Sequence, residues 1–277
     1  MKHILILALV GLSISSFSQE IPQDGYFCSK NLQGAEPTPY PEIRTSDIMS
    51  VKRVWRDIDT DEDANRLFIS PQSRLIDVIV DAIQNGNITA YSPSHTKTNP
   101  SGDSFTDPMS IKDALAEFIS DSVMVPVFDS SGVQISSKMK GGEFNPNMVT
   151  KFRLKEDWIF DKGRGVYEPR IVGIAPLVKI NAIGEIIAEQ PAFWINFEQA
   201  RKVFCQKQVV TTYTTDLSYD DVFILRKFKS KIVKEATPAD LKIKDYTQDE
   251  EKEAQRIESS IADYRKAIWN KNSSTIN

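Results

Sequence analysis

Histidine and cysteine are both scarce in this chain of 277 residues, which contains two of each. A Ser-His-Asp or Cys-His apparatus would have to use His95 as its base, because His3 lies at the very start of the chain. A zinc site needs several Cys or His ligands, and His95 has no second one at ligand spacing. We therefore expect no catalytic residues, no metal site and no cofactor, and we interpret His95 as part of a polar loop.

Long apolar runs are also lacking, apart from the one at residues 4–14. This run follows Lys2 and is followed by Ser16 and Ser18, so charged, apolar and small residues come in the order of a secretory signal. It is shorter than the ~20 apolar residues that a membrane-spanning helix needs. The sequence therefore predicts a signal peptide over residues 1–18, cleaved after Ser18, and an exported, soluble protein without direct membrane insertion.

A surplus of basic residues is absent as well, since the formal net charge is -4 and the pI is near 5.4. This balance argues against a nucleic-acid partner, because phosphate contacts require a basic face. Export makes a disulfide between Cys28 and Cys205 chemically feasible. Two unpaired, half-buried thiols are the alternative, because pairing requires Cα atoms within ~7 Å of each other.

Three regions follow the predicted signal peptide. Prolines at four positions predict an extended arm over residues 19–44, which is a candidate segment for docking on a partner. Residues 45–235 mix helical and strand patterns without a regular βαβ alternation, which predicts one α+β domain with a mainly antiparallel sheet. Residues 236–277 predict a C-terminal helical tail, whose apolar stripe comprises Ile257, Ile261, Tyr264 and Ile268.

Apolar residues spaced three and four apart predict further helices within the domain. The first carries Ile48, Val51, Val54, Trp55 and Ile58; the others cover residues 70–86, 110–119 and 220–233. We expect Ser70 to cap the second helix and Ser110 the third, with Ile111, Leu115, Phe118 and Ile119 facing inward.

Strand patterns are clearest at residues 152–160, where large apolar residues alternate with charged ones. Residues 170–180 are almost continuously apolar, which is typical of a strand covered on both faces. Shorter strands are expected at 193–197, at 87–91, and at 123–128 and 133–136 around a turn.

Acidic residues alternate at Asp57, Asp59, Asp61 and Asp63, as at the start of a calcium-binding loop. An EF-hand loop requires glycine at its sixth position and glutamate at its twelfth, where this chain has Glu62 and Phe68. The run therefore favours an acidic turn.

Several blocks of this chain resemble the GldN/PorN family of gliding-motility and type IX secretion proteins of Bacteroidota. The blocks are VKRVWRDID at residues 51–59, KEDWIFD at 155–161, RIVGIAP at 170–176, FWI at 193–195 with Arg201, and DDVF at 220–223. Asn196 and Ala236 depart from the family pattern, and the C-terminal helix matches it least.

The resemblance implies a periplasmic, non-enzymatic protein that is bound to an outer-membrane lipoprotein, GldK/PorK. It also implies self-association in a ring near the GldL/GldM motor proteins. Asp121-Ser122-Val123 resembles the short sequence that Bacteroidota glycosylate on exported proteins, and a helix-to-strand turn is the alternative interpretation of Ser122.

A candidate partner-contact surface comprises Arg153, Lys155, Glu156, Asp157 and Arg170. The alternative is that these charges pair with neighbouring strands of the same sheet. Two other functions remain open at this point: an exported carboxylate-based hydrolase using Glu156 and Asp157, and a periplasmic solute-binding module.

Overall fold

The computed structural model describes residues 32–116, 118–119, 123–129, 131, 134–140, 144–182, 185–209 and 217–274. The predicted signal peptide, Cys28 and Ser122 lie outside these residues, as does the first half of the predicted arm. Within the described part of the chain, no helix is long and apolar enough to span a membrane.

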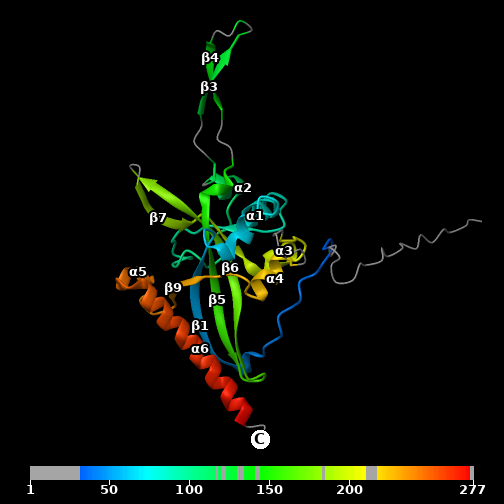
Figure 1. Cartoon of the computed structure of the whole chain (residues 1–277), viewed down its shortest axis with the longest axis vertical. Coiled ribbons are helices and arrows are strands. Elements are labelled where there is room, and N and C mark those ends of the chain that lie inside the picture. The colour runs from blue at the N-terminus through cyan, green and yellow to red at the C-terminus, as the bar shows by residue number, and fades with distance from the viewer. Residues whose placement is uncertain are drawn as a thin grey trace, which may run out of the picture. The chain divides into compact units, whose positions relative to one another are not determined.

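A seven-stranded sheet forms the centre of the protein, with the order β2-β8-β6-β5-β1-β9 and with β7 paired to β6 (Figure 1). Every strand pair is antiparallel, which confirms the predicted α+β class. The strands are β1 (Ile48–Asp59), β2 (Ala90–Tyr91), β5 (Val149–Asp161), β6 (Val166–Ala182), β7 (Glu185–Pro191), β8 (Trp194–Asn196) and β9 (Lys231–Glu235). The strands β3 (Val123–Phe128) and β4 (Gln134–Lys140) pair with each other in a second sheet, as expected.

The helices are α1 (Leu75–Gln84), α2 (Ile111–Ala116), α3 (Phe197–Phe204), α4 (Tyr219–Ile224), α5 (Ile243–Tyr246) and α6 (Glu250–Ser274). Short 3-10 turns lie at Thr45–Asp47, Asp63–Ile69 and Pro146–Met148. The apolar face predicted for α1 is confirmed, since Leu75, Ile76, Ile79 and Ile83 are buried. The helix starts at Leu75 with Arg74 as its N-cap residue, whereas Ser70 follows the last residue of the 3-10 turn Asp63–Ile69.

The helix predicted over residues 48–58 is wrong, because this segment is strand β1, paired with β5 along its length and with β9 at its end. Val54 and Ile58 face one side of the sheet and Trp55 faces the other, and all three are buried. Because β1 is buried on both faces, its apolar residues are spaced three and four apart along the sequence, as they would be in a helix.

The segment at residues 220–233 is not one helix either. Helix α4 ends at Ile224, Arg226 has a φ of 53°, and Ile232 lies in strand β9 opposite Arg56. In the third predicted helix, α2 ends at Ala116, and Ile111 and Ile119 are exposed rather than inward-facing.

The alternation predicted for residues 152–160 is confirmed by β5, where Phe152, Leu154 and Trp158 are buried on one face. Helices α1, α3 and α4 cover one half of this face through an aromatic-rich core, and α6 covers the other half (Figure 1). The predicted stripe of α6 is confirmed at Ile257, Ile261 and Ile268. Tyr264 is 41% exposed, and its ring packs edge-on against Tyr167.

Candidate functional site

Charged side chains form a ladder on the face of β1 and β5 opposite to the helices; we call it the charged face. The antiparallel register places Arg53 across from Asp157, Asp57 from Arg153, and Asp59 from Lys151. Arg53 donates to both carboxylate oxygens of Asp157 at 2.6 and 2.7 Å, and Arg153 does the same to Asp57 at 2.7 and 2.8 Å. Opposite charges directly across a strand pair stabilise the register, so the ladder fixes how β1 meets β5.

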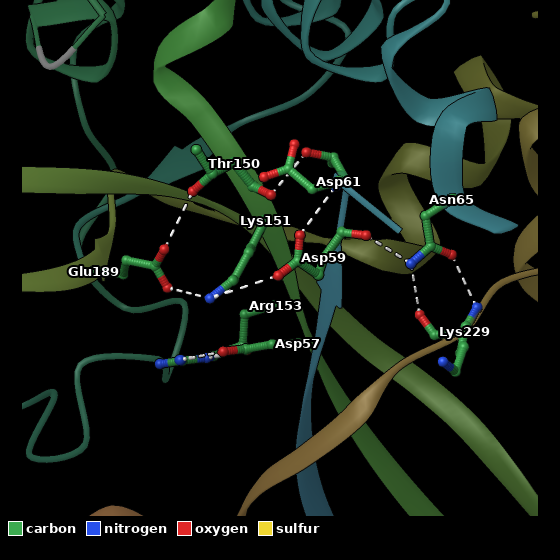
Figure 2. A network of polar contacts seen from close by, with 10 residues as sticks. Asp57, Asp59, Asp61, Asn65, Thr150, Lys151, Arg153, Glu189 and Lys229 are labelled. Carbon is green, nitrogen blue, oxygen red and sulfur yellow. Dashed lines mark hydrogen bonds and ion pairs between the residues drawn. The ribbon is translucent and has the colours of Figure 1, made fainter. Parts of the chain in front are cut away.

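The end of the ladder joins further segments (Figure 2). Lys151 lies 2.7 Å from Glu189 of β7 and 3.8 Å from Asp59. Asn65 donates to the backbone carbonyls of Asp59 and Lys229 and accepts from the Lys229 amide, which ties β1 to the segment before β9. The charged face is therefore part of a connected polar network that holds several strands in place.

Lys155 lies in the middle of this face, but it is only 5% exposed. Its Nζ is 3.0 Å from Asp103 Oδ1, and Trp55 donates to the other Asp103 oxygen at 2.7 Å. Burial lowers the pKa of Lys155, and Asp103 offsets this only in part. Burial would raise the pKa of Asp103, but hydrogen bonds from Ser101 and Lys155 together with the charge of Lys155 outweigh burial and hold the pKa below its usual range. The pair fastens the loop that carries Asp103 onto the sheet.

Glu156 points to the opposite face of β5 and is fully buried. It accepts from Arg56 at 2.9 Å and from Arg226 at 2.7 Å, and Arg56 also lies 2.8 Å from Glu258 of α6. On β5, Glu156 lies between Leu154 of the aromatic-rich core and Trp158 of the cluster under α6. The arginines neutralise this carboxylate where two apolar clusters meet.

This geometry contradicts a catalytic pairing of Glu156 and Asp157, the two residues named for the hydrolase alternative. Two catalytic carboxyl groups must flank one scissile bond, whereas Glu156 and Asp157 are consecutive on a strand and project to opposite faces. Each is also engaged by arginine, Asp157 by Arg53 and Glu156 by Arg56.

The five residues expected to contact a partner therefore differ in exposure. Lys155 and Glu156 are buried, which removes them from any surface in this conformation. Arg153, Asp157 and Arg170 are half-buried and reach the surface. Their contact with a partner stays a prediction, although each is also engaged within its own chain.

Sequence reasoning missed a depression of about 270 Å³ beside the ladder. Its walls include Asp57, Asp59, Lys151 and Arg153 of the ladder, with Lys231 and Lys242 contributed from much later in the chain. Burial, followed by the nearby positive charge of Arg153, lowers the pKa of Lys242. The pairing of β9 with β1 brings Lys231 here, and a bridge to Lys234 of β9 brings Lys242, so no local pattern could have indicated the site.

The other expectations have the following outcomes. Asp57, Asp59 and Asp63 of the acidic run lie near basic side chains, and the described residues contain no cluster of His, Cys, Asp or Glu that could hold a metal ion.

Cys205 is buried and its thiol donates to the Ala35 carbonyl at 3.1 Å. Its pairing with Cys28 stays a prediction. Asn196, one of the departures from the family pattern, caps α3 by accepting from the Gln199 amide.

The Arg153–Asp57 pair is expected to show a coupling free energy of about 1–3 kcal/mol in a double-mutant cycle with alanine, measured by urea unfolding. Both side chains are only 12–13% exposed and the pair is bidentate. Arg66 and Asp63 serve as the control, because they are 3.4 Å apart and largely exposed, and no measurable coupling is expected. Equal coupling in the two pairs would contradict a structural role for the ladder.

The model of one protein family matches most of the chain. It is described as Gliding motility associated protein GldN and matches residues 43–270. The matched region contains all seven strands of the central sheet and nearly all of α6. No curated protein matches the chain.

Proposed function

Because the chain belongs to the GldN family of gliding-motility proteins, we propose that it is a non-enzymatic structural component of their periplasmic ring. Members of this family are components of the gliding-motility and type IX secretion machinery. In the proposed assembly the protein binds the outer-membrane lipoprotein GldK/PorK, associates with further copies of itself, and lies near the GldL/GldM motor proteins.

The charged face is the observation that supports a structural role best. Its acids and bases are matched across β1 and β5, so these side chains are engaged in holding the two strands in register. A surface of this kind recognises a partner through the complementarity of its charges. Arg153, Asp157 and Arg170 are the candidate contacts with the lipoprotein, since they are the charges of the predicted set that reach the surface.

Native mass spectrometry of the tagged protein purified from its own cells tests the assembly. The expected result is a complex of high mass that contains the lipoprotein, together with loss of export of secreted proteins in a deletion strain. Recovery of a monomer alone, with normal secretion in the deletion strain, would contradict the proposal.

A charge swap tests the charged face itself. Arg153→Asp combined with Asp57→Arg preserves a pair of opposite charges across the strands but reverses the charge that each position presents. We expect the swapped protein to keep most of its stability, because the two side chains still attract each other. We expect it to lose most of the lipoprotein from the purified complex, because each swapped charge would then face a like charge on the lipoprotein.

The matched control is the same swap at Arg66 and Asp63, an exposed pair outside the ladder. It is expected to leave the complex unchanged. If both swaps leave the complex intact, the charged face is not the contact surface, and the ring assignment is judged by the mass measurement alone.

A further inference from the structure

An extended segment of the predicted arm, residues 35–41, crosses β6 and α3; we call it the strap. The body of the protein holds it mainly through its backbone carbonyls. Cys205 and Gln206 donate to the Ala35 carbonyl at 3.1 and 3.2 Å, and Arg201 Nη2 donates to the Thr38 carbonyl at 2.5 Å. Arg170 donates to the Pro41 carbonyl. The strap is thus bound as a peptide is bound in a groove.

One side chain of the strap fills a specific socket. The ring of Tyr40 lies against two guanidinium groups, 4.9 Å from that of Arg170 and 4.8 Å from that of Arg201. Arg201 is 1% exposed and is fixed by Asp220, whose carboxylate oxygens lie 2.8 and 3.0 Å from its Nε and Nη2. Stacking an aromatic ring on arginine is favourable, most of all where water is excluded. The socket is therefore built by the body and is specific for an aromatic side chain.

The sequence of the strap suits binding as a separate ligand. Its prolines at 37, 39 and 41 alternate with Thr38 and Tyr40, so the chain is stiff, extended and poor in amide donors. Extended proline-rich peptides bind grooves in this manner because little conformational freedom is lost on binding. The described part of the arm also contributes no residue to the three hydrophobic clusters. Releasing the strap would therefore leave the core intact.

Two donors of the socket have no acceptor among the described residues, namely Arg170 Nε and Arg201 Nη1, both buried. Glu198 approaches Arg201 Nη1 only to 3.8 Å. Unsatisfied buried donors weaken the closed arrangement, because their lost hydration is not replaced. The strap therefore does not satisfy every donor of its socket.

We propose that in the assembled protein this groove takes the strap of a second copy, so that neighbouring subunits are linked by strap exchange. The contacts described above all fall on residues 35–41, so an identical strap from a second copy can make each of them. Strap and groove are different surfaces, and an interface between different surfaces links copies head to tail, which generates rings or open chains. The inference rests on the self-association in the proposed function and identifies the contact that would produce it.

Mixing two full-length variants tests strap exchange. Tyr40→Ala removes the ring from the strap but leaves the groove, and Arg170→Ala damages the groove but leaves the strap. Each change is expected to weaken strap binding about tenfold or more. Native mass spectrometry distinguishes the two chains by mass. We expect each variant alone to remain monomeric and the equimolar mixture to give one-to-one heterodimers, in which one intact strap occupies one intact groove.

A mixture that stays monomeric, with both variants folded by circular dichroism, would overturn strap exchange. If Arg170→Ala does not fold, Arg170→Gln repeats the test with a side chain that can still donate to the Pro41 carbonyl. Tyr40→Phe is the conservative control and is expected to assemble like the unmodified chain, because it retains the ring. If the mixture fails while the unmodified protein still co-purifies with the lipoprotein in a large complex, exchange is wrong and the proposed function stands.

Discussion

Replacing Glu156 by alanine is expected to destabilise the protein by about 3–5 kcal/mol, since removing one partner leaves the others as uncompensated buried charge. Glu156 is fully buried and accepts from both Arg56 and Arg226. Arg56 is 3% exposed and retains only Glu258, on the solvent side of α6. The free energy of unfolding from urea denaturation measures the loss.

Glu258→Ala is the matched control, because it removes a carboxylate from the same arginine. Glu258 is 52% exposed, so the expected loss is at most about 1 kcal/mol. Similar losses in the two variants would show that the burial of Glu156, and its position between two apolar clusters, does not matter.

Replacing Phe223 by alanine is expected to destabilise the protein by about 3–5 kcal/mol, because the cavity left by a buried aromatic ring adds to the lost transfer free energy. Phe223 is fully buried at the centre of the larger core. Four other rings have centroids within 6 Å of its own, those of Phe68, Phe197, Phe204 and Phe228. Thermal and urea unfolding both report the change.

Phe144→Ala provides the comparison, since Phe144 is 36% exposed and its ring packs on Phe118. A loss of about 1 kcal/mol is expected there. Phe223→Leu should recover part of the stability lost with alanine, because it refills part of the cavity. If leucine were no better than alanine at this position, ring packing rather than volume would dominate the core.

The two proposals concern neighbouring surfaces, which meet at Arg170, opposite Asp157 in the pairing of β5 with β6. The charged face lies on β1 and β5 and is proposed to meet the lipoprotein, while the strap and its groove involve residues 35–41, β6 and α3. Arg170 belongs to the set predicted for the first surface, yet the structure engages it with Tyr40 and Pro41 of the strap. Its substitution therefore affects strap binding directly.

Local patterns in the sequence correctly indicated the strand and the helix whose buried apolar residues lie on one face only. Strand β5 has one apolar and one charged face, so its apolar residues recur every second position and predict a strand. Helix α6 has a single buried stripe, so its apolar residues recur with the helical period of 3.6 residues. The turn after Asp161 and the end of α1 near Gly86, with its φ of 71°, were indicated by the residues themselves.

Strand β1 and the segment after α4 were misread because their burial comes from distant partners. The first half of β1 pairs only with β5, while its second half lies between β5 and β9. Ile232 is buried by β1 and α6 rather than by helical neighbours. A short apolar run covered on both faces fits a helix as well as a strand, and only long-range pairing decides between them.

The sequence by itself determined that the sheet is mainly antiparallel and which residues of β5 and α6 face inward. It could not determine what each charge does. Lys155, Glu156 and Asp157 are consecutive, yet one binds a loop, one lies between two clusters and one pairs across the strand. Those roles depend on cross-strand register and on the burial of each side chain, and both arise only when segments a hundred residues apart come together.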